Sequence, residues 1–338
     1  RFSDLFSYNL LVLLLFISSI TMLMGGLVAN FEFDLKKIIA FSTLSQLGLM
    51  MSILALGEEV LSFFHLLMHA LFKALLFMCS GSMIYNMNNC QDIRYMGSLM
   101  GFIPLTSVFF NICSVAICGL PFLSGFYSKD LILEFMSFGY INLYVYVIFY
   151  ISVGFTIMYS IRLFYYTLIS NYNGLGYMLI SDSKFMMMKG MGGLIIFGIV
   201  GGSMMSWLMF PTPFFICLPI FMKFMVLWVL FLSAMVGYII SNINFVDNSK
   251  IMCMYICSLF MMNMWNMNNL STFGVNYIFT KLSMNISIYL DQGWCEYFGS
   301  QNLFNCVKMS SFYFQEIFNN NIKVFLTMLV IWLCLVFL

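Results

Sequence analysis

The chain has 338 residues, of which 62% are hydrophobic and only 8% are charged, and its mean hydropathy is +0.97. A soluble domain of this length could not cover its surface with so few polar groups, so the composition indicates a multi-span membrane protein. The net charge of +1 is too small to indicate nucleic acid as a partner.

Apolar runs long enough to cross a bilayer recur along the chain, because about 20 apolar residues span the hydrocarbon core. We predict about eight such spans. They are Leu10–Ala29, Ile38–Gly57, Leu61–Ile84, Phe102–Phe138, Tyr140–Ile169, Met191–Phe210, Ile220–Ile240 and Val324–Leu338. The expected fold class is therefore all-α, a polytopic transmembrane helix bundle.

The third span carries both histidines of the chain, His65 and His69, together with Lys73. Their spacing of four residues places them on one side of a helix, within an arc of about 80°. Histidine titrates near neutral pH and a buried lysine can be shifted toward it, so the row suits a water-assisted proton relay. The polar residues of the second span that could line the relay are Ser42, Thr43, Ser45 and Gln46. The alternative is that the row consists of hydrogen-bonded core residues of the bundle.

The fourth run, Phe102–Phe138, is too long for one straight helix. The residues that interrupt it are Gly119, Pro121 and Gly125. A broken transmembrane helix leaves backbone groups unpaired, which is tolerated only where protein or water satisfies them, and such a break marks an ion pathway. We therefore predict one broken helix here.

Three ionisable residues follow the break, Lys129, Asp130 and Glu134. A lysine at membrane depth is costly unless it is paired or hydrated, and the neighbouring Asp130 would favour its protonated form. These residues are candidate proton carriers. The alternative is that Lys129 and Asp130 extend to the membrane surface from a helix end.

The C-terminal third has a different pattern. Ile251–Met262 is apolar but too short to span, which favours an interfacial or re-entrant segment. Between Lys281 and Asn320 apolar and charged residues are mixed, as in an amphipathic helix that lies along a membrane. We expect a membrane bundle over residues 1–241, a connecting segment over 242–280, a lateral helix over 281–320 and a terminal transmembrane anchor over 321–338.

Loop charge predicts the orientation. If Arg1 lies on one face, the loops of the opposite face carry most of the basic residues, which are Lys36, Lys37, Arg94, Lys184, Lys189, Lys250 and Lys281. By the positive-inside rule that face, with the lateral helix, is the cytosolic or matrix face.

No cofactor site is predicted in this chain. The ten cysteines are scattered through apolar runs, as expected of small core residues. His65 and His69 could form one edge of a zinc site, but no further ligand has suitable spacing. Two histidines on one helix face cannot sandwich a haem, and no iron-sulfur cysteine set or phosphate-binding glycine loop is present.

Four strings, in this order, carry a resemblance to a known family. They are DLKKIIAFSTLSQLGLM (Asp34–Met50), FFHLLMHALFKALLFMCSG (Phe63–Gly81), NNCQDIRYMG (Asn88–Gly97) and GLPFLSGFYSKDLILE (Gly119–Glu134). They closely resemble mitochondrial NADH-ubiquinone oxidoreductase chain 5, the distal antiporter-like membrane subunit of respiratory complex I. The resemblance is specific over about the first half of the chain; beyond it, the likeness is one of layout.

The resemblance implies a proton-translocating, multi-pass subunit of the mitochondrial inner membrane, in a complex that passes electrons from NADH to ubiquinone. His65, His69 and Lys73 would then form the central relay, and Lys129 with Asp130 the terminal site. FMN and iron-sulfur clusters would belong to other subunits. Partners would be other membrane-arm subunits, above all the neighbouring antiporter-like subunit, and lipids such as cardiolipin. This chain would correspond to the C-terminal part of such a subunit, without its first repeat.

Two other functions stay open at this point. One is a subunit of a free-standing cation/proton antiporter complex, which shares the same core. The other is a purely structural membrane subunit, which the row of ionisable residues argues against.

Overall fold

The computed structural model describes residues 3–138, 142–176, 179–182, 185–242, 255–319 and 321–338. These residues form helices and connecting loops, with a single isolated β-bridge between Asp34 and Asp92. The prediction of an all-α fold is therefore confirmed. The chain divides into two compact units, Arg1–Trp265 and Asn266–Leu338, which we describe separately.

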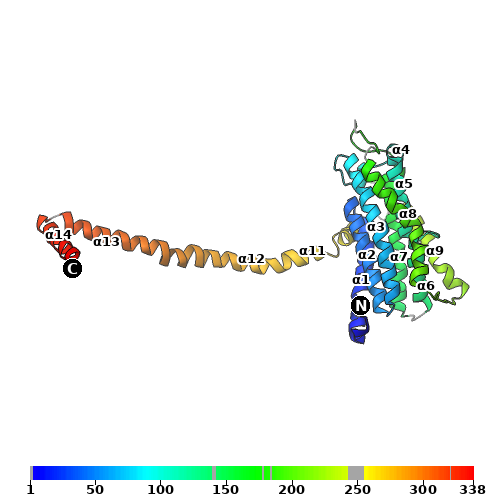
Figure 1. Cartoon of the computed structure of the whole chain (residues 1–338), viewed down its shortest axis with the longest axis horizontal. Helices are drawn as coiled ribbons and strands as arrows, with labels where there is room; N and C mark the ends of the chain where they lie inside the picture. The colour runs from blue at the N-terminus through cyan, green and yellow to red at the C-terminus, as the bar shows by residue number, and fades with distance from the viewer. Residues whose placement is uncertain (1–2, 139–141, 177–178, 183–184, 243–254, 320) are drawn as a thin grey trace. The chain divides into compact units, whose positions relative to one another are not determined.

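The first unit is a helix bundle (Figure 1). Its helices are α1 (Tyr8–Phe31), α2 (Leu35–Ala55), α3 (Glu59–Asn86), α4 (Leu99–Phe102), α5 (Pro104–Cys118), α6 (Ser124–Phe138), α7 (Leu143–Phe164), α8 (Phe185–Met209), α9 (Ile220–Asn242) and α10 (Tyr255–Met262). Helix α3 packs on α2, α5, α6 and α8, while α7 packs on α1, α5 and α9. Because α3 is central, neighbouring helices surround its polar row.

Six helices of the described chain are long and apolar enough to cross a membrane, or up to seven if a bent pair counts as one span. The six correspond to six of the predicted apolar runs. The fourth run is instead two helices of 15 residues each, and the last is a 16-residue helix. The predicted number of spans, about eight, therefore stays a prediction.

The break in the fourth run has a clear backbone cause. Helix α5 ends at Gly119, whose φ of +83° is the left-handed conformation that glycine adopts freely. Helix α6 then crosses α5 so closely that a Cβ on Gly125 would lie 1.8 Å from the Ala116 carbonyl oxygen. These two glycines permit the chain to stop one helix and start the next inside the bundle.

Close helix approach also depends on small residues between α1 and α2. A Cβ on Gly25 would lie 2.9 Å from the Ser45 nitrogen, and one on Gly48 would lie 2.8 Å from the Met22 nitrogen. Small residues at such positions let backbones touch, which is how helices associate in lipid, where the hydrophobic effect contributes little.

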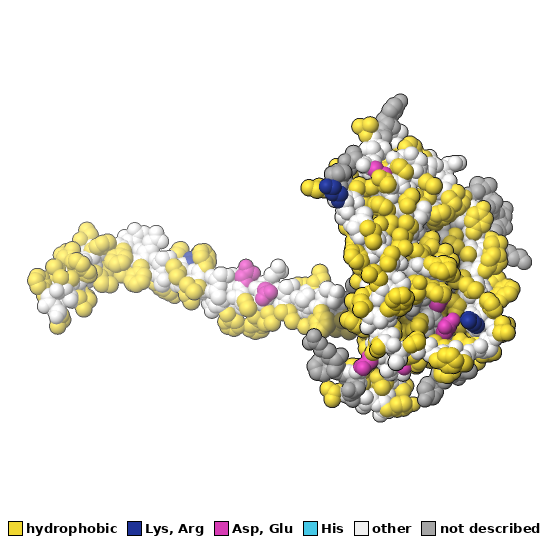
Figure 2. All heavy atoms as spheres, turned by 45° about the vertical axis from the view of Figure 1, so that its right-hand side comes forward, with side chains coloured by type: hydrophobic (Ala, Val, Ile, Leu, Met, Phe, Trp, Pro, Cys, Tyr) yellow, Lys and Arg dark blue, Asp and Glu magenta, His cyan; other side chains and the backbone are white. Residues whose placement is uncertain are grey.

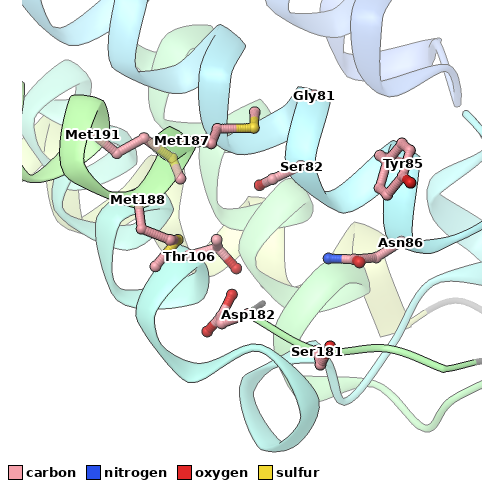
Figure 3. Close-up of a pocket in the computed structure, with 10 residues that line it drawn as sticks. All are labelled: Gly81, Ser82, Tyr85, Asn86, Thr106, Ser181, Asp182, Met187, Met188 and Met191. Carbon is pink, nitrogen blue, oxygen red and sulfur yellow. The ribbon is translucent and has the colours of Figure 1, made fainter. Parts of the chain in front are cut away.

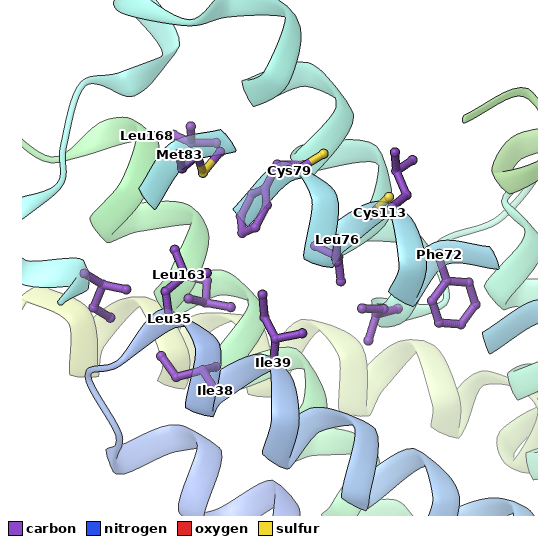
Figure 4. Packing of buried hydrophobic residues seen from close by; sticks show 14 of the residues in the cluster. Leu35, Ile38, Ile39, Phe72, Leu76, Cys79, Met83, Cys113, Leu163 and Leu168 are labelled. Atoms are coloured by element: carbon purple, nitrogen blue, oxygen red, sulfur yellow. The ribbon is translucent and has the colours of Figure 1, made fainter. Parts of the chain in front are cut away.

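The main apolar core lies between α2, α3, α5 and α7 (Figure 4). Its residues include Leu35, Ile38, Ile39, Phe72, Leu76, Cys79, Met83, Cys113, Leu163 and Leu168. The outer face of the bundle also carries many exposed large hydrophobic side chains, and in the view of Figure 2 they are widespread with few charges among them. A protein that is apolar inside and outside is what a bilayer requires.

The second unit is a long helical run followed by a short apolar helix. The run consists of α11 (Met267–Asn269), α12 (Val275–Ile286) and α13 (Asn302–Asn319), joined by the wider π-helical turns Leu270–Gly274, Ser287–Cys295 and Tyr297–Gln301. Helix α14 (Ile322–Phe337) follows, and Phe325 meets Phe318 of α13 with ring centroids 4.8 Å apart.

A long helix before the last span was predicted, but it begins at Met267, not at Lys281. The earlier residues lack the charged positions that revealed the amphipathic pattern, so the sequence understated its length. Of the predicted segment 251–262, the structure describes only Tyr255–Met262, as α10. Residues 251–254, Arg1, Lys184 and Lys250 lie outside the described residues, and the fourfold division of the chain stays a prediction.

Candidate functional site

The polar row of α3 is buried. His65, His69 and Lys73 are 1%, 8% and 4% exposed. Their spacing of four residues keeps them on one helix face, and the packing of α2, α5, α6 and α8 around α3 covers that face. The row therefore points into the bundle and not toward lipid.

His65 contacts two neighbouring helices. Its Nδ1 lies 3.0 Å from the Ser128 hydroxyl of α6, and its Nε2 lies 3.2 Å from the side-chain oxygen of Gln46 on α2. An amide oxygen only accepts, so the neutral ring donates from Nε2 to Gln46 and accepts from Ser128 at Nδ1. The ring thus has a donor contact and an acceptor contact on opposite sides, as a group that passes protons needs.

Lys73 and His69 continue the row. The Lys73 ammonium donates to the Ser42 hydroxyl of α2. His69 lies between them, with its ring centroid 6.3 Å from that of His65 and an edge-to-face contact with Phe72 at 5.6 Å. The Nε2 of His69 is buried and has no hydrogen-bond partner within the described chain. A buried ring nitrogen of this kind is available for an additional polar contact.

Lys129 occupies the broken helix. It is 2% exposed and donates to the Thr156 hydroxyl of α7 at 2.8 Å and to the Ile117 carbonyl of α5 at 3.2 Å. Ile117 lies in the last turn of α5, where carbonyl oxygens have no partner within the helix. The break therefore supplies an acceptor at depth, and the lysine uses it.

Asp130 and Glu134, the two carboxylates close to Lys129 in sequence, do not pair with it. Asp130 is 9% exposed, and one of its carboxyl oxygens lies 3.4 Å from the position that a Cβ on Gly119 would occupy. Glu134, one turn further along α6, is half-buried. The ion pairs within the described residues are Lys37–Asp34 and Arg94–Asp92, so the adjacent Lys129 and Asp130 do not form one. Neighbouring helix residues project about 100° apart, which explains why adjacency in sequence did not produce a pair.

The supporting polar residues were predicted in part. Ser42, Ser45 and Gln46 are buried as the sequence suggested, whereas Thr43 is half-buried and its hydroxyl donates to the Ala40 carbonyl of its own helix. The Lys129 partner Thr156 was missed. It lies 27 positions from Lys129, and nothing in its local sequence distinguishes it from a packing residue.

A buried arginine was also missed as a functional feature. Arg162 of α7 is 5% exposed and donates to the Asn30 carbonyl at the end of α1. Its guanidinium lies 4.6 Å from the centre of the Phe33 ring, and that of Arg94 lies 4.4 Å from the same centre. Two guanidiniums on one aromatic ring connect α7 to the α1–α2 loop, at a distance along the chain that local pattern cannot reveal.

A cavity of about 270 Å³ lies at the C-terminal end of α3 (Figure 3). Its lining residues are Gly81, Ser82, Tyr85, Asn86, Thr106, Ser181, Asp182, Met187, Met188 and Met191. The Cys79 thiol, which precedes this lining on α3, contacts the Met191 sulfur at 3.6 Å. The cavity contains none of the ionisable residues of the row. Across the described chain, no three His, Cys, Asp or Glu side chains are grouped as a metal site would require.

Two family models together match the whole chain. One described as NADH dehydrogenase subunit 5 C-terminus matches residues 159–338, and one described as NADH:quinone oxidoreductase/Mrp antiporter, TM, matches residues 1–158. The first covers more than half of the chain.

Curated proteins that share one name are similar to this chain over most of its length. NADH-ubiquinone oxidoreductase chain 5 of Aedes aegypti is 50% identical over 319 residues, which are 94% of this chain and 55% of that protein. The proteins of that name from Anopheles gambiae and Lumbricus terrestris are 47% and 35% identical, over 98% and 88% of this chain and 57% and 52% of their own lengths. The chain thus spans about half the length of these relatives.

Among solved structures, a chain of the Mrp complex from Dietzia sp. DQ12-45-1b matches with a TM-score of 0.56 at 20% identity. The match covers 82% of this chain and 33% of that one. At this identity the likeness shows a shared fold and no more.

Proposed function

The chain belongs to the NADH dehydrogenase subunit 5 family, and on this premise we propose that it is a proton-translocating membrane subunit of respiratory complex I. In this proposal the assembled complex transfers electrons from NADH to ubiquinone, and this chain carries protons across the mitochondrial inner membrane. The chain itself would hold no redox cofactor. FMN and the iron-sulfur clusters would reside in other subunits of the complex.

The observation that carries the proposal is the way the two buried lysines are held. Lys73 and Lys129 donate to hydroxyls and, for Lys129, to a backbone carbonyl, and neither forms an ion pair with a carboxylate in the described part of the chain. A buried ammonium costs several kcal/mol unless it is compensated. Neutral acceptors compensate it less than a carboxylate does, so such a lysine can gain and lose a proton as its surroundings change.

The residues divide into two groups in this mechanism. His65, His69 and Lys73 form the central relay, in which the His65 ring connects Gln46 to Ser128 and so links α2 with α6. Lys129, Asp130 and Glu134 form the terminal group on α6, beyond the helix break. Each step moves one proton between neighbouring nitrogen or oxygen atoms, directly or through water, and no electron passes through this chain.

The proposal extends to partners and orientation. The names of the relatives support membrane-arm subunits of complex I as partners, above all the neighbouring antiporter-like subunit. The helical run Met267–Asn319 has no buried side chains within this chain, which suits a lateral strap along other subunits. Anionic lipids such as cardiolipin would fill gaps between them. The loops rich in lysine and arginine, with the lateral helix, would face the matrix.

A subunit of a free-standing cation/proton antiporter is the second candidate. The shared fold with a chain of the Mrp complex favours it. The relatives that are 50% and 49% identical to this chain, however, are both named NADH-ubiquinone oxidoreductase chain 5. A purely structural subunit is disfavoured, because it would have no reason to bury His65, Lys73 and Lys129 at such cost.

The test is to isolate the membrane complex that contains the subunit and to assay it in sealed vesicles. We expect flavin and iron-sulfur subunits to copurify, and NADH oxidation by ubiquinone to drive proton translocation. Lys73→Met should reduce that translocation severalfold, while Lys36→Met, a change at an exposed lysine of α2, should not. Isolation without flavin, together with cation/proton exchange, would establish the antiporter alternative instead.

A further inference from the structure

Tyr159 of α7 is a buried tyrosine to which the proposed mechanism has given no role. It is 2% exposed, and its hydroxyl has no hydrogen-bond partner within the described chain. Buried hydroxyls are nearly always paired. A tyrosine that keeps an unpaired hydroxyl in the interior calls for a reason other than filling space.

The surroundings of this hydroxyl are polar. It lies beside Ser42, Ser45 and Gln46 of α2, close to them but outside hydrogen-bond geometry. Two of these are the groups that the relay uses, because Lys73 donates to Ser42 and His65 contacts the Gln46 oxygen. The side-chain nitrogen of Gln46 is likewise buried without a partner in the described chain. The Tyr159 hydroxyl therefore lies beside the same α2 side chains that His65 and Lys73, the two ends of the row, contact.

Helix α7 also connects Tyr159 to the broken helix. Thr156, one turn earlier, accepts the hydrogen bond of Lys129. Ser160, the next residue, lies 2.8 Å from the thiol of Cys118, the last residue of α5 before the break. A single turn of α7 thus carries both Thr156, which accepts from Lys129, and Tyr159, which lies beside the α2 groups that His65 and Lys73 contact.

We propose that the Tyr159 hydroxyl is a relay residue that passes protons between the His65–Lys73 row and Lys129. The proposal rests on the proposed function and adds the connection between its two groups of residues. A hydroxyl has one proton to donate and lone pairs to accept with. A proton arriving at the oxygen from the Ser42 side would be matched by departure of the hydroxyl proton, through water, toward Lys129. Tyr159 ends neutral, one proton has moved, and no electron is transferred.

A packing role predicts a different outcome. The Tyr159 ring lies in the apolar core beside α2 and α3, and phenylalanine would fill the same volume without an unpaired hydroxyl. If only the ring matters, Tyr159→Phe should behave as wild type, and Tyr159→His, which is smaller and polar, should be the more damaging change. If the hydroxyl relays protons, the order is reversed, because histidine can carry protons and phenylalanine cannot.

The experiment measures NADH-driven proton translocation by the assembled complex in sealed vesicles, with the amount of assembled complex determined for each variant. Tyr159→Phe should lower translocation severalfold, and Tyr159→His should restore part of the loss. The matched control is Tyr146→Phe on the same helix, whose hydroxyl contacts the Met222 sulfur of α9 at 3.5 Å. It should translocate protons as wild type does.

Failure of the inference is distinguishable from failure of the proposed function. Normal translocation by Tyr159→Phe, in a complex that Lys73→Met inactivates, would overturn the Tyr159 relay and leave the function standing. Normal translocation by Lys73→Met as well would overturn the proposed function. If neither Tyr159 variant assembles, hydrogen exchange into heavy water separates the cases in the wild-type complex. A mobile, exchanging Tyr159 hydroxyl during turnover supports the relay, and a hydroxyl that never exchanges contradicts it.

Discussion

Lys129 is buried inside the bundle, at 2% exposed. Its ammonium is held between one hydroxyl, that of Thr156, and one backbone carbonyl, that of Ile117. A hydrogen bond to a charged group contributes about 1.5–3 kcal/mol. Because few contacts hold the protonated lysine, removal of either one should change how readily it holds a proton.

The first prediction concerns Thr156→Val, which keeps the shape of the side chain and removes the hydroxyl. We expect proton translocation in the assembled complex to fall severalfold, because the charged form of Lys129 loses one of its two acceptors. Thr167→Val serves as the control, since the Thr167 hydroxyl bonds only within its own helix, to the Leu163 carbonyl. Equal rates in the two variants would show that Thr156 has no part in the relay.

The second prediction concerns Glu32, which lies in the loop after α1. Burial raises the pKa of the Glu32 carboxyl above its ordinary value of 4.5, although Lys37 and Arg162 act in the opposite direction. When a carboxyl has a higher pKa in the folded state than in the unfolded state, the protein loses stability as the pH rises from the unfolded to the folded pKa. Glu32→Gln should therefore melt at a higher temperature than wild type at about pH 7.5, and at the same temperature near pH 4.

This prediction is checked by thermal melting of the detergent-solubilised subunit at the two pH values. The control is Glu296→Gln at an exposed carboxylate of the second unit, which should melt as wild type does at both. A Glu32→Gln variant that is less stable at neutral pH would show that the attraction of the Glu32 carboxylate to the charges of Lys37 and Arg162 outweighs the cost of its burial.

At the residue scale, sequence pattern predicted the groups that carry charge and, of the groups that hold them, those on α2. The spacing of His65, His69 and Lys73 determines one helix face, so their common burial follows from helix geometry. Ser128, Thr156 and Tyr159 come from other helices, and only helix packing brings Ser128 to His65, Thr156 to Lys129 and Tyr159 to the polar residues of α2. Their own sequence surroundings look like those of any polar residue in an apolar helix.

At the element scale, the broken helix places the lysine. The sequence predicted the break because proline and glycine interrupt an overlong apolar run. The contact between the half-helices could not be predicted, because it depends on Gly125 meeting the Ala116 carbonyl of α5.

Gly125→Ala tests that contact and is the third prediction. A Cβ 1.8 Å from the Ala116 oxygen forces α5 and α6 apart, at a cost of about 3 kcal/mol or more. We expect much less assembled complex and a lower melting temperature. Gly192→Ala in α8, where a Cβ meets nothing within 4 Å, should leave both unchanged. A normally assembled Gly125→Ala complex would mean that the half-helices do not approach as described.

The fourth prediction concerns the proposed lateral strap. Glu296 and Lys308 are exposed, so replacing both with alanine should leave proton translocation near normal in the assembled complex. Phe314 is also exposed, at 54%, and stacks on Phe318, and Phe314→Asp should reduce assembly by placing a charge on an apolar contact surface. Quantitative blue native electrophoresis with a translocation assay checks both. Lost translocation in the fully assembled double alanine variant would assign the strap a direct part in proton transfer.

At the scale of the whole molecule, composition alone identified a membrane protein, and run length located its main spans. The number of spans does not follow from run length alone, because the two short helices of the broken run and the short final helix do not each reach the length of a single span. The long C-terminal helix was predicted in kind and underestimated in length, since its first part has few charges to show a polar face.

In the proposed mechanism, protons cross this chain by way of Lys129. Lys129→Met removes the titrating group and keeps most of the apolar volume, whereas Lys129→Arg keeps the charge but does not release its proton in the physiological range. The direct measurement is the number of protons translocated per electron by fully assembled complex in sealed vesicles. We predict a lower ratio for both variants than for wild type, and a wild-type ratio in assembled Lys129→Met complex would contradict the claim.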